Sequence, residues 1–143
     1  MRPINLVALI DDDEIVKFIG SKVIESTNLV NRIKTFSNGE EAINFLKSNS
    51  KNLDLLPEII LLDLSMPIMD GFEFLEKYIM LEPKLGKKIA IYVVSSSISP
   101  TDIERINKIS EVSDYIIKPI TKEKFEKIVR VLIEEQSSNL NVS

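Results

Sequence analysis

The sequence predicts an α/β fold in which a parallel sheet carries helices on both faces. Strand-like and helix-like segments alternate five times along the 143 residues. Parallel strands need crossover connections, so this alternation is typical of a parallel sheet covered by helices. Two of the segments are short, continuous apolar runs, the pattern of strands that are buried on both faces. Each of these runs ends on an acid, at Asp11 and at Asp63.

The first half of the chain predicts three strands, at residues 4–10, 31–36 and 59–63, and two helices. The second strand is short and more polar, as expected near a sheet edge. Ser37 and Glu40 have the spacing of a capping box, which predicts the start of the second helix. Apolar residues at helical spacing mark one face of each helix: Ile15, Phe18, Ile19, Val23 and Ile24 in the first, and Ala42, Ile43, Phe45 and Leu46 in the second.

The second half predicts three more helices and two strands, at residues 89–94 and 114–117. Ser99 and Pro100 begin the fourth helix, which is expected to run to about Ser110. From Glu135 the chain is polar and is expected to fray, which predicts a domain over residues 1–135 and a tail over 136–143. The third helix carries Phe72, Phe74, Leu75 and Ile79, and the fifth, capped by Thr121, carries Phe125, Ile128, Val129, Leu132 and Ile133.

The composition excludes several classes of protein and of functional site. The length is that of one domain. The chain has no cysteine and no histidine, which excludes disulfides, histidine metal sites, catalytic triads and a phosphohistidine-carrier role. A net charge of −4 argues against nucleic-acid binding. No apolar run approaches the ~18 residues of a membrane span, and the first one stops at Asp11 without a signal-peptide cleavage site. We therefore expect a cytoplasmic protein.

Charged and hydroxyl side chains follow the predicted strands where each one ends. Asp11 and Asp12 follow the first strand, Asp63 ends the third, Ser95 follows the fourth and Lys118 follows the fifth. Ligands of parallel sheets bind at this edge. Two carboxylates ~4 Å apart repel by roughly 4 kcal/mol at an effective dielectric of about 20, so three of them need a cation, a shared proton or water. One lysine offsets one charge, and the oxygen ligands suit Mg²⁺.

Simpler interpretations exist for single residues. Asp13 and Glu14 fall where the first helix begins, and acids are stabilised there by the helix dipole. This is the favoured interpretation for these two. Lys118 alone is compatible with a surface turn, Ser95 with a hydroxyl that caps a loop, and Tyr115 with the core. Acids that close two buried strands are costly without a purpose, which favours a functional pocket.

Several phosphate chemistries are excluded. The chain has four glycines and neither a P-loop nor a dinucleotide fingerprint. Phosphatases of the haloacid dehalogenase type use an aspartate after a strand and a second aspartate two positions on, where this chain has Ser65. What remains is a carboxylate nucleophile with a metal and a lysine. Such a set can accept a phosphoryl group as an acyl phosphate and hold it.

Over residues 4–134 the sequence resembles the receiver domain of two-component response regulators, in a single-domain, chemotaxis-regulator-like form. The motifs that carry the resemblance are Asp11-Asp12, Asp63 with Met66-Pro67 and Asp70-Gly71, Ser95, and Tyr115 with Lys118-Pro119. The resemblance implies a flavodoxin-like, doubly wound sheet of five parallel strands in the order 2-1-3-4-5, with five helices.

The resemblance also implies a role for each site residue. Asp63 is expected to accept the phosphoryl group, and Lys118 and Ser95 are expected to contact it. Ser95 and Tyr115 are expected to form the conformational switch. The metal ligands that it implies for Mg²⁺ are Asp11, Asp12, Asp63 and the backbone carbonyl of Ser65.

A receiver of this kind takes its phosphoryl group from a sensor histidine kinase or a histidine phosphotransfer protein. It then signals to a downstream protein partner, which the sequence does not name. The polar tail after Leu132 predicts a stand-alone domain without an output domain. It is expected to assist its own phosphorylation and slow dephosphorylation, with no separate turnover substrate and no membrane or nucleic-acid ligand. The alternative is a receiver fold that binds partners independently of phosphorylation. An enzyme on small phosphorylated substrates is disfavoured, because no base, acid or substrate pocket can be named.

Overall fold

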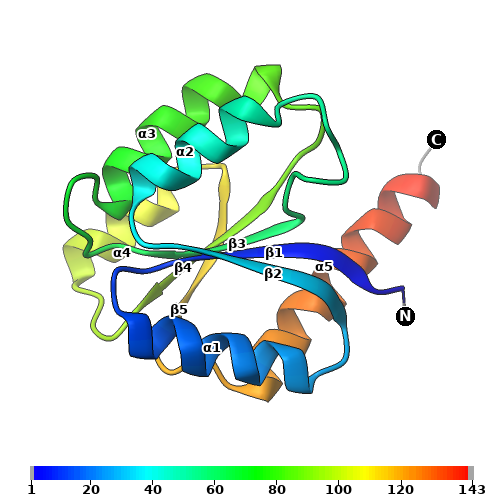
Figure 1. Cartoon of the computed structure of the whole chain (residues 1–143), viewed down its shortest axis with the longest axis horizontal. Helices are drawn as coiled ribbons and strands as arrows, with labels where there is room; N and C mark the ends of the chain where they lie inside the picture. Colours follow the sequence, from blue (N-terminus) through cyan, green and yellow to red (C-terminus); the bar gives the residue numbers. More distant parts are fainter. Residues whose placement is uncertain (1, 142–143) are drawn as a thin grey trace.

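The computed structural model describes residues 2–141, and its centre is a parallel sheet with the strand order β2-β1-β3-β4-β5 (Figure 1). β3 is central and is buried at every position. β2 lies at an edge, as its polar sequence predicts. The flavodoxin-like fold is therefore confirmed. The strands are β1 (Ile4–Ile10), β2 (Val30–Phe36), β3 (Ile59–Asp63), β4 (Ala90–Ser95) and β5 (Val112–Ile117).

Helices cover both faces of the sheet, with α2, α3 and α4 on one face and α1 and α5 on the other (Figure 1). The two faces form separate cores because strand side chains alternate. Ile60 and Leu62 of β3 belong to the core under α2 and α3, and Ile59 and Leu61 to the core under α5. The helices are α1 (Glu14–Ser26), α2 (Gly39–Ser48), α3 (Gly71–Leu81), α4 (Pro100–Asn107) and α5 (Lys122–Asn141), with a 3₁₀ turn at Glu82–Lys84.

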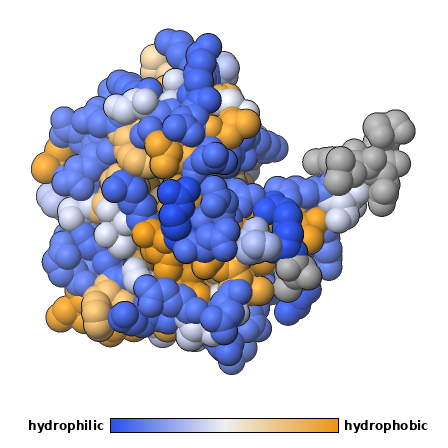
Figure 2. Space-filling view, turned by 45° about the vertical axis from the view of Figure 1, so that its right-hand side comes forward, coloured by the Kyte–Doolittle hydropathy of each residue, from blue (hydrophilic) through white to orange (hydrophobic). Residues whose placement is uncertain are grey.

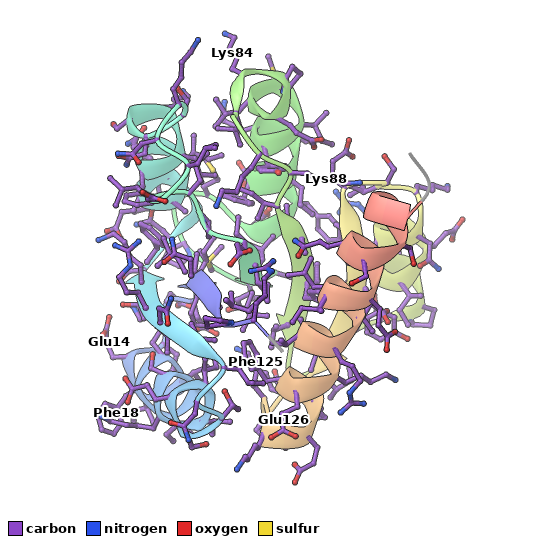
Figure 3. All side chains as sticks on the ribbon, turned by 90° about the vertical axis from the view of Figure 1, so that its right-hand side faces the viewer. Glu14, Phe18, Lys84, Lys88, Phe125 and Glu126 are labelled. Carbon is purple, nitrogen blue, oxygen red and sulfur yellow. The ribbon has the colours of Figure 1, made fainter. Side chains whose placement is uncertain are left out.

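The apolar face of α1 is only partly buried. Ile15, Phe18 and Ile19 are 69%, 63% and 53% exposed, and Phe18 points away from the sheet in Figure 3, whereas Phe125 of α5 points inward. The helix instead turns Lys17, Gly20 and Ile24 toward the sheet, and it approaches closely at Gly20, where an added Cβ would lie 3.1 Å from a methyl group of Leu9. In Figure 2, hydrophobic side chains gather in the lower part of the view, the level of α1 and α5 in Figure 1.

Other predicted details need correction. The N-cap of α2 is Asn38 and not Ser37, because the Asn38 side chain accepts from the backbone N–H of Glu41 at 2.9 Å. The Ser37 N–H instead donates to the Glu41 carboxylate at 3.1 Å. In α3, Tyr78 is fully buried, whereas the predicted Ile79 is 40% exposed. The caps predicted at Ser99 and Thr121 are present.

Two helix ends also differ from the prediction. α5 does not fray at Glu135 but continues to Asn141, and the Gln136 side chain accepts a hydrogen bond from Arg2 near the start of the chain. α4 ends at Asn107 because the chain turns there, with the Lys108 N–H bonded to the carbonyl of Arg105. The division into residues 1–135 and 136–143 stays a prediction. Within residues 2–141, the helices are too short or too polar to cross a membrane.

The substitution Gly71→Ala tests how closely α3 approaches the end of β3. A Cβ at Gly71 would lie 2.7 Å from both the Asp63 carbonyl oxygen and the Leu64 Cα, which are backbone atoms and cannot move aside cheaply. We expect a loss of about 1–3 kcal/mol in unfolding free energy, measured by urea denaturation. The control is Gly86→Ala, whose Cβ would come too close only to the exposed, movable side chain of Leu53, while the Ser50 carbonyl oxygen lies at an ordinary contact distance of 3.6 Å. Equal losses in the two variants would contradict this account.

Candidate functional site

The pairing of β1 with β3 brings two of the predicted acids together. The strands are parallel, and Ile10 pairs with Leu62, so Asp11 and Asp63 occupy the next position of the same register. Both are buried, with 2% and 6% of their surface exposed, and Asp12 is exposed beside them. One carboxylate oxygen from each of these acids lies within 4.8 Å of the others. The predicted acidic pocket is present.

Lys118 brings a positive charge into this pocket from the end of β5. Its Nζ lies 2.7 Å from Oδ2 of Asp11 and 3.8 Å from Oδ1 of Asp63. The backbone N–H of Lys118 donates to the carbonyl of Ser95 at 2.8 Å, which ties the loop to the end of β4. The Lys118–Pro119 peptide bond is cis. The lysine therefore bridges both buried carboxylates, with its closer contact to Asp11.

The carboxyl group of Asp63 is electrostatically unfavourable in its ionised form. Burial and the charge of Asp11 raise the pKa of Asp63 to about 6, against the opposing effect of Lys118. The Ser65 N–H donates to Asp63 Oδ1, but at a long 3.3 Å. Asp11 has closer hydrogen-bond partners than Asp63. Its Oδ1 accepts from the Asp13 N–H at 2.9 Å, and its Oδ2 accepts from the Lys118 ammonium. The negative charge that remains uncompensated in the pocket therefore lies mainly on Asp63.

This donor set fits a hard divalent cation. Asp11, Asp12 and Asp63 offer oxygen ligands only, which Mg²⁺ prefers, and burial together with the charge of Asp11 raises the pKa of Asp63 despite the nearby Lys118. A cation here would favour the ionised carboxylates that bind it. Asp13 has a different role, because its side chain caps α1 by accepting from the backbone N–H groups of Ile15 and Val16. Its position at the helix start predicts this cap.

The two predicted switch residues lie on the neighbouring strands. Ser95 is buried at the end of β4, and its hydroxyl donates to the carbonyl of Ser97 at 2.9 Å rather than to an acid. Tyr115 of β5 is half-buried and packs with Ile106 of α4 in a small apolar cluster. Their switching role stays a prediction, as does the Ser65 carbonyl as a metal ligand.

Two supporting residues were missed from the sequence. Lys17 of α1 is 4% exposed, and its ammonium donates to Glu14 and to the Ser37 hydroxyl at 2.8 and 2.7 Å. It thereby fastens the start of α1 to the loop after β2. A lysine between apolar helix positions gives no such signal in a single sequence. Gly71, named only within a motif, lets α3 start directly against the Asp63 carbonyl.

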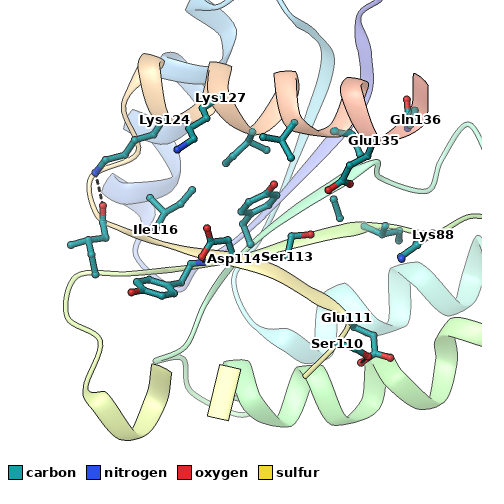
Figure 4. A pocket seen from close by; sticks show the side chains of 18 residues that line it. Lys88, Ser110, Glu111, Ser113, Asp114, Ile116, Lys124, Lys127, Glu135 and Gln136 are labelled. Atoms are coloured by element: carbon teal, nitrogen blue, oxygen red, sulfur yellow. Dashed lines mark hydrogen bonds between the residues drawn. The ribbon is translucent and has the colours of Figure 1, made fainter. Parts of the chain in front are cut away.

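A cavity of about 130 Å³ opens at the site, and its wall includes Asp11, Asp63 and Lys118. A larger pocket of about 730 Å³ lies elsewhere, between β5 and α5 (Figure 4). Lys124 and Lys127 border it on α5, and Lys124 donates to the carbonyl of Ile117. None of the three clustered carboxylates lines this pocket, so the larger of the two pockets is not the one that contains the acidic cluster.

Comparison with known proteins agrees with the geometry. The profile of the response regulator receiver domain matches residues 7–130. The chain belongs to this receiver family. A crystal structure of a two-component response regulator from Cytophaga hutchinsonii superposes with a TM-score of 0.85 at 29% identity, covering 93% of this chain and 99% of that one.

Curated relatives place the receiver in proteins of different length. The probable methanogenesis regulatory protein FilR2 of Methanothrix harundinacea is 27% identical over 129 residues, 90% of this chain and 81% of that protein. A protein-glutamate methylesterase/protein-glutamine glutaminase of Geobacter sulfurreducens is 34% identical over 131 residues. This receiver spans 92% of its own length there but only 32% of the enzyme's, so the enzyme's activities are not assigned to it.

The raised pKa of Asp63 predicts how Asp63→Asn changes stability with pH. Between pH ~4 and ~6 the folded state holds the Asp63 proton more tightly than the unfolded chain, so stability falls as pH rises through this window. A rise from 3.8 to about 6 corresponds to at most about 3 kcal/mol. In EDTA, Asp63→Asn should therefore be more stable than the wild type at pH 8, and the gain should vanish near pH 4. Urea denaturation at both pH values measures it.

The matched control is Asp54→Asn, which removes an exposed carboxylate from the loop before β3, at the other end of that strand from Asp63. We expect this variant to follow the wild type at both pH values. A gain for Asp63→Asn that is the same at pH 4 and pH 8 would contradict the electrostatic explanation.

Proposed function

We propose that this receiver accepts a phosphoryl group on Asp63, with Mg²⁺, from the phosphohistidine of a sensor histidine kinase or a histidine phosphotransfer protein. The observation that carries the proposal is the cluster of Asp11, Asp12 and Asp63 carboxylates within 4.8 Å, with Lys118 bridging the two buried ones. Membership of the receiver family supports the same assignment.

The transfer needs one nucleophile and charge compensation. A carboxylate oxygen of Asp63 attacks phosphorus in line, an O–P bond forms, and the N–P bond breaks with its electron pair left on the imidazole of the donor. Asp11, Asp12, Asp63 and the Ser65 carbonyl would hold Mg²⁺, which neutralises charge on the transferring group. Lys118 is the side chain of the pocket that can pair with a phosphoryl oxygen, by moving from Asp11.

The same residues favour retention of the phosphoryl group over turnover. The chain has no histidine, and Ser65 stands where a phosphatase of the related chemistry has its general acid. We therefore propose that the receiver assists its own phosphorylation and slow dephosphorylation and has no separate substrate. Its output is a conformational change. The Ser95 side chain turns to the phosphoryl group, and Tyr115 moves together with the apolar cluster that it forms with Ile106 of α4.

A protein donor also accounts for the exposed face of α1. Ile15, Phe18 and Ile19 begin two residues after the Asp13 cap, so they lie beside the mouth of the pocket. Exposed apolar side chains that cluster in this way mark interaction surfaces. We propose that the phosphodonor covers this face, and that the receiver acts in the cytoplasm as a stand-alone domain on a protein partner.

Asp63→Asn should abolish phosphorylation. Incubated with phosphoramidate and Mg²⁺, the wild type should gain one phosphoryl group that hydroxylamine and alkali remove, detected by mass spectrometry. Asp63→Asn should gain none, because an amide cannot attack phosphorus. Asp13→Asn is the matched control, since asparagine also caps helices well, and it should be phosphorylated like the wild type. Stable phosphorylation of Asp63→Asn would refute the acceptor assignment.

Beryllium fluoride with Mg²⁺ separates the proposal from the alternative, a phosphorylation-independent interaction module. Bound only to the folded state, it should raise the Tm of the wild type but not of Asp63→Asn. Ser95→Ala should retain much of the Tm increase but lose the accompanying change in Tyr115 fluorescence, followed in a Tyr78→Phe, Tyr92→Phe background. An unchanged wild-type Tm and fluorescence would favour the interaction module.

A further inference from the structure

One residue in the loop after Asp63 has a strained backbone. Ile68 has φ of 70°, in the left-handed region that β-branched residues rarely adopt. The Met69 N–H donates to the Pro67 carbonyl at 2.7 Å across it. A hydrogen bond between residues i+2 and i with positive φ at the centre is the pattern of a γ-turn, a rare and strained form. Glycine or asparagine would adopt this conformation at lower cost.

The side chain of Ile68 contributes little to the hydrophobic core. It is 73% exposed, although isoleucine is among the residues most often buried. Its neighbours hold the turn in place: Met66 and Met69 are each 9% exposed and belong to the core under α2 and α3. Met69 also packs against Gly39, where an added Cβ would lie 3.0 Å from its side chain. The turn is anchored on both sides, and it holds Ile68 out into solvent.

The turn lies in the loop that follows the acceptor residue, one of the loops at the carboxyl edge of the sheet that form the rim around Asp63. The loop from Leu64 to Asp70 leaves the carboxyl end of β3 at Asp63, and it is closed by the Gly71 N–H, which donates to the Leu64 carbonyl at 2.9 Å. Asp63 itself is only 6% exposed. A protein that brings phosphorus within bonding distance of this recessed carboxylate must lay its own surface on the rim. A small phosphodonor that enters the pocket need not touch the rim.

We propose that Ile68 is a specificity-determining residue for protein phosphodonors, through an apolar contact between its side chain and the donor protein. The inference rests on the proposed phosphoacceptor function and adds to it. Strain at an exposed residue points to function when the surrounding structure imposes it, and here two buried methionines impose it beside the acceptor. The proposed partner is the donor rather than the downstream protein, because only the donor must reach Asp63.

The test compares two donors on the same variants. Phosphoramidate is the small donor, and the protein donor is a purified histidine phosphotransfer domain that carries phosphohistidine and phosphorylates the wild type. Ile68→Gly and Ile68→Asn relieve the backbone strain and remove the apolar contact. The matched control is Met80→Asn, which removes a 79% exposed apolar side chain from α3, near the end of that helix remote from Asp63.

We expect both Ile68 variants to keep the wild-type rate with phosphoramidate within about twofold and to have an equal or higher Tm. With the protein donor, kcat/KM should fall by about tenfold or more, chiefly through KM, since removing an interface anchor weakens docking. Met80→Asn should match the wild type with both donors. The split between donors distinguishes lost docking from a damaged pocket.

Two outcomes would overturn the inference while leaving the phosphoacceptor function intact. One is an unchanged kcat/KM of both Ile68 variants with the protein donor. The other is an equal loss with both donors, which would mean that Ile68 shapes the pocket itself. If the wild type is not phosphorylated on Asp63 by phosphoramidate, the phosphoacceptor function fails first, and the failure is recognised before any variant is compared.

Discussion

The structure depends on a concentration of like charge at one edge of a buried sheet. β1 and β3 pair in a register that places Asp11 and Asp63 next to each other, and Asp12 adds a third carboxylate. Lys118 neutralises one of these charges, and it contacts Asp11 more closely than Asp63. Burial of unpaired charge is among the most costly features that a fold can carry. The surrounding elements must therefore hold this arrangement in place.

The support around the pocket is correspondingly rigid. The acids extend from the two most buried strands, so their backbones have little freedom to relax. Asp13 fixes the start of α1, and Lys17 ties that helix to the loop after β2. Gly71 lets α3 begin against the Asp63 carbonyl. α4, by contrast, buries only Ile106 among its own residues. The elements that hold the acids are therefore well packed, whereas α4, on the side of the proposed switch, is lightly packed.

The features that follow from chain periodicity were predictable from the sequence. Continuous apolar runs predicted the central strands, and the acids at their ends predicted the pocket, because parallel strands share one carboxyl edge. Lys118 was identified by the same argument. Features that depend on how closely two elements approach were not predictable. On α1, the face with Gly20 lies against the sheet and the predicted apolar stripe stays largely exposed, and the buried ammonium of Lys17 contacts its partner Ser37, twenty residues away. The positive φ of Ile68 occurs between the buried side chains of Met66 and Met69, and no local propensity indicates it.

The resting contacts of Lys118 and Ser95 bear on how a phosphoryl group would act as a switch. Each already has a partner: the lysine pairs with Asp11, and the serine hydroxyl donates to the Ser97 carbonyl. A phosphoryl dianion on Asp63 would therefore compete for donors that are in use, and each new contact replaces an existing one. Exchange of this kind has a small net free energy, since the desolvation cost has been met in both states. Two arrangements of similar stability, differing in which oxygens hold the same two donors, are what a bistable receiver requires.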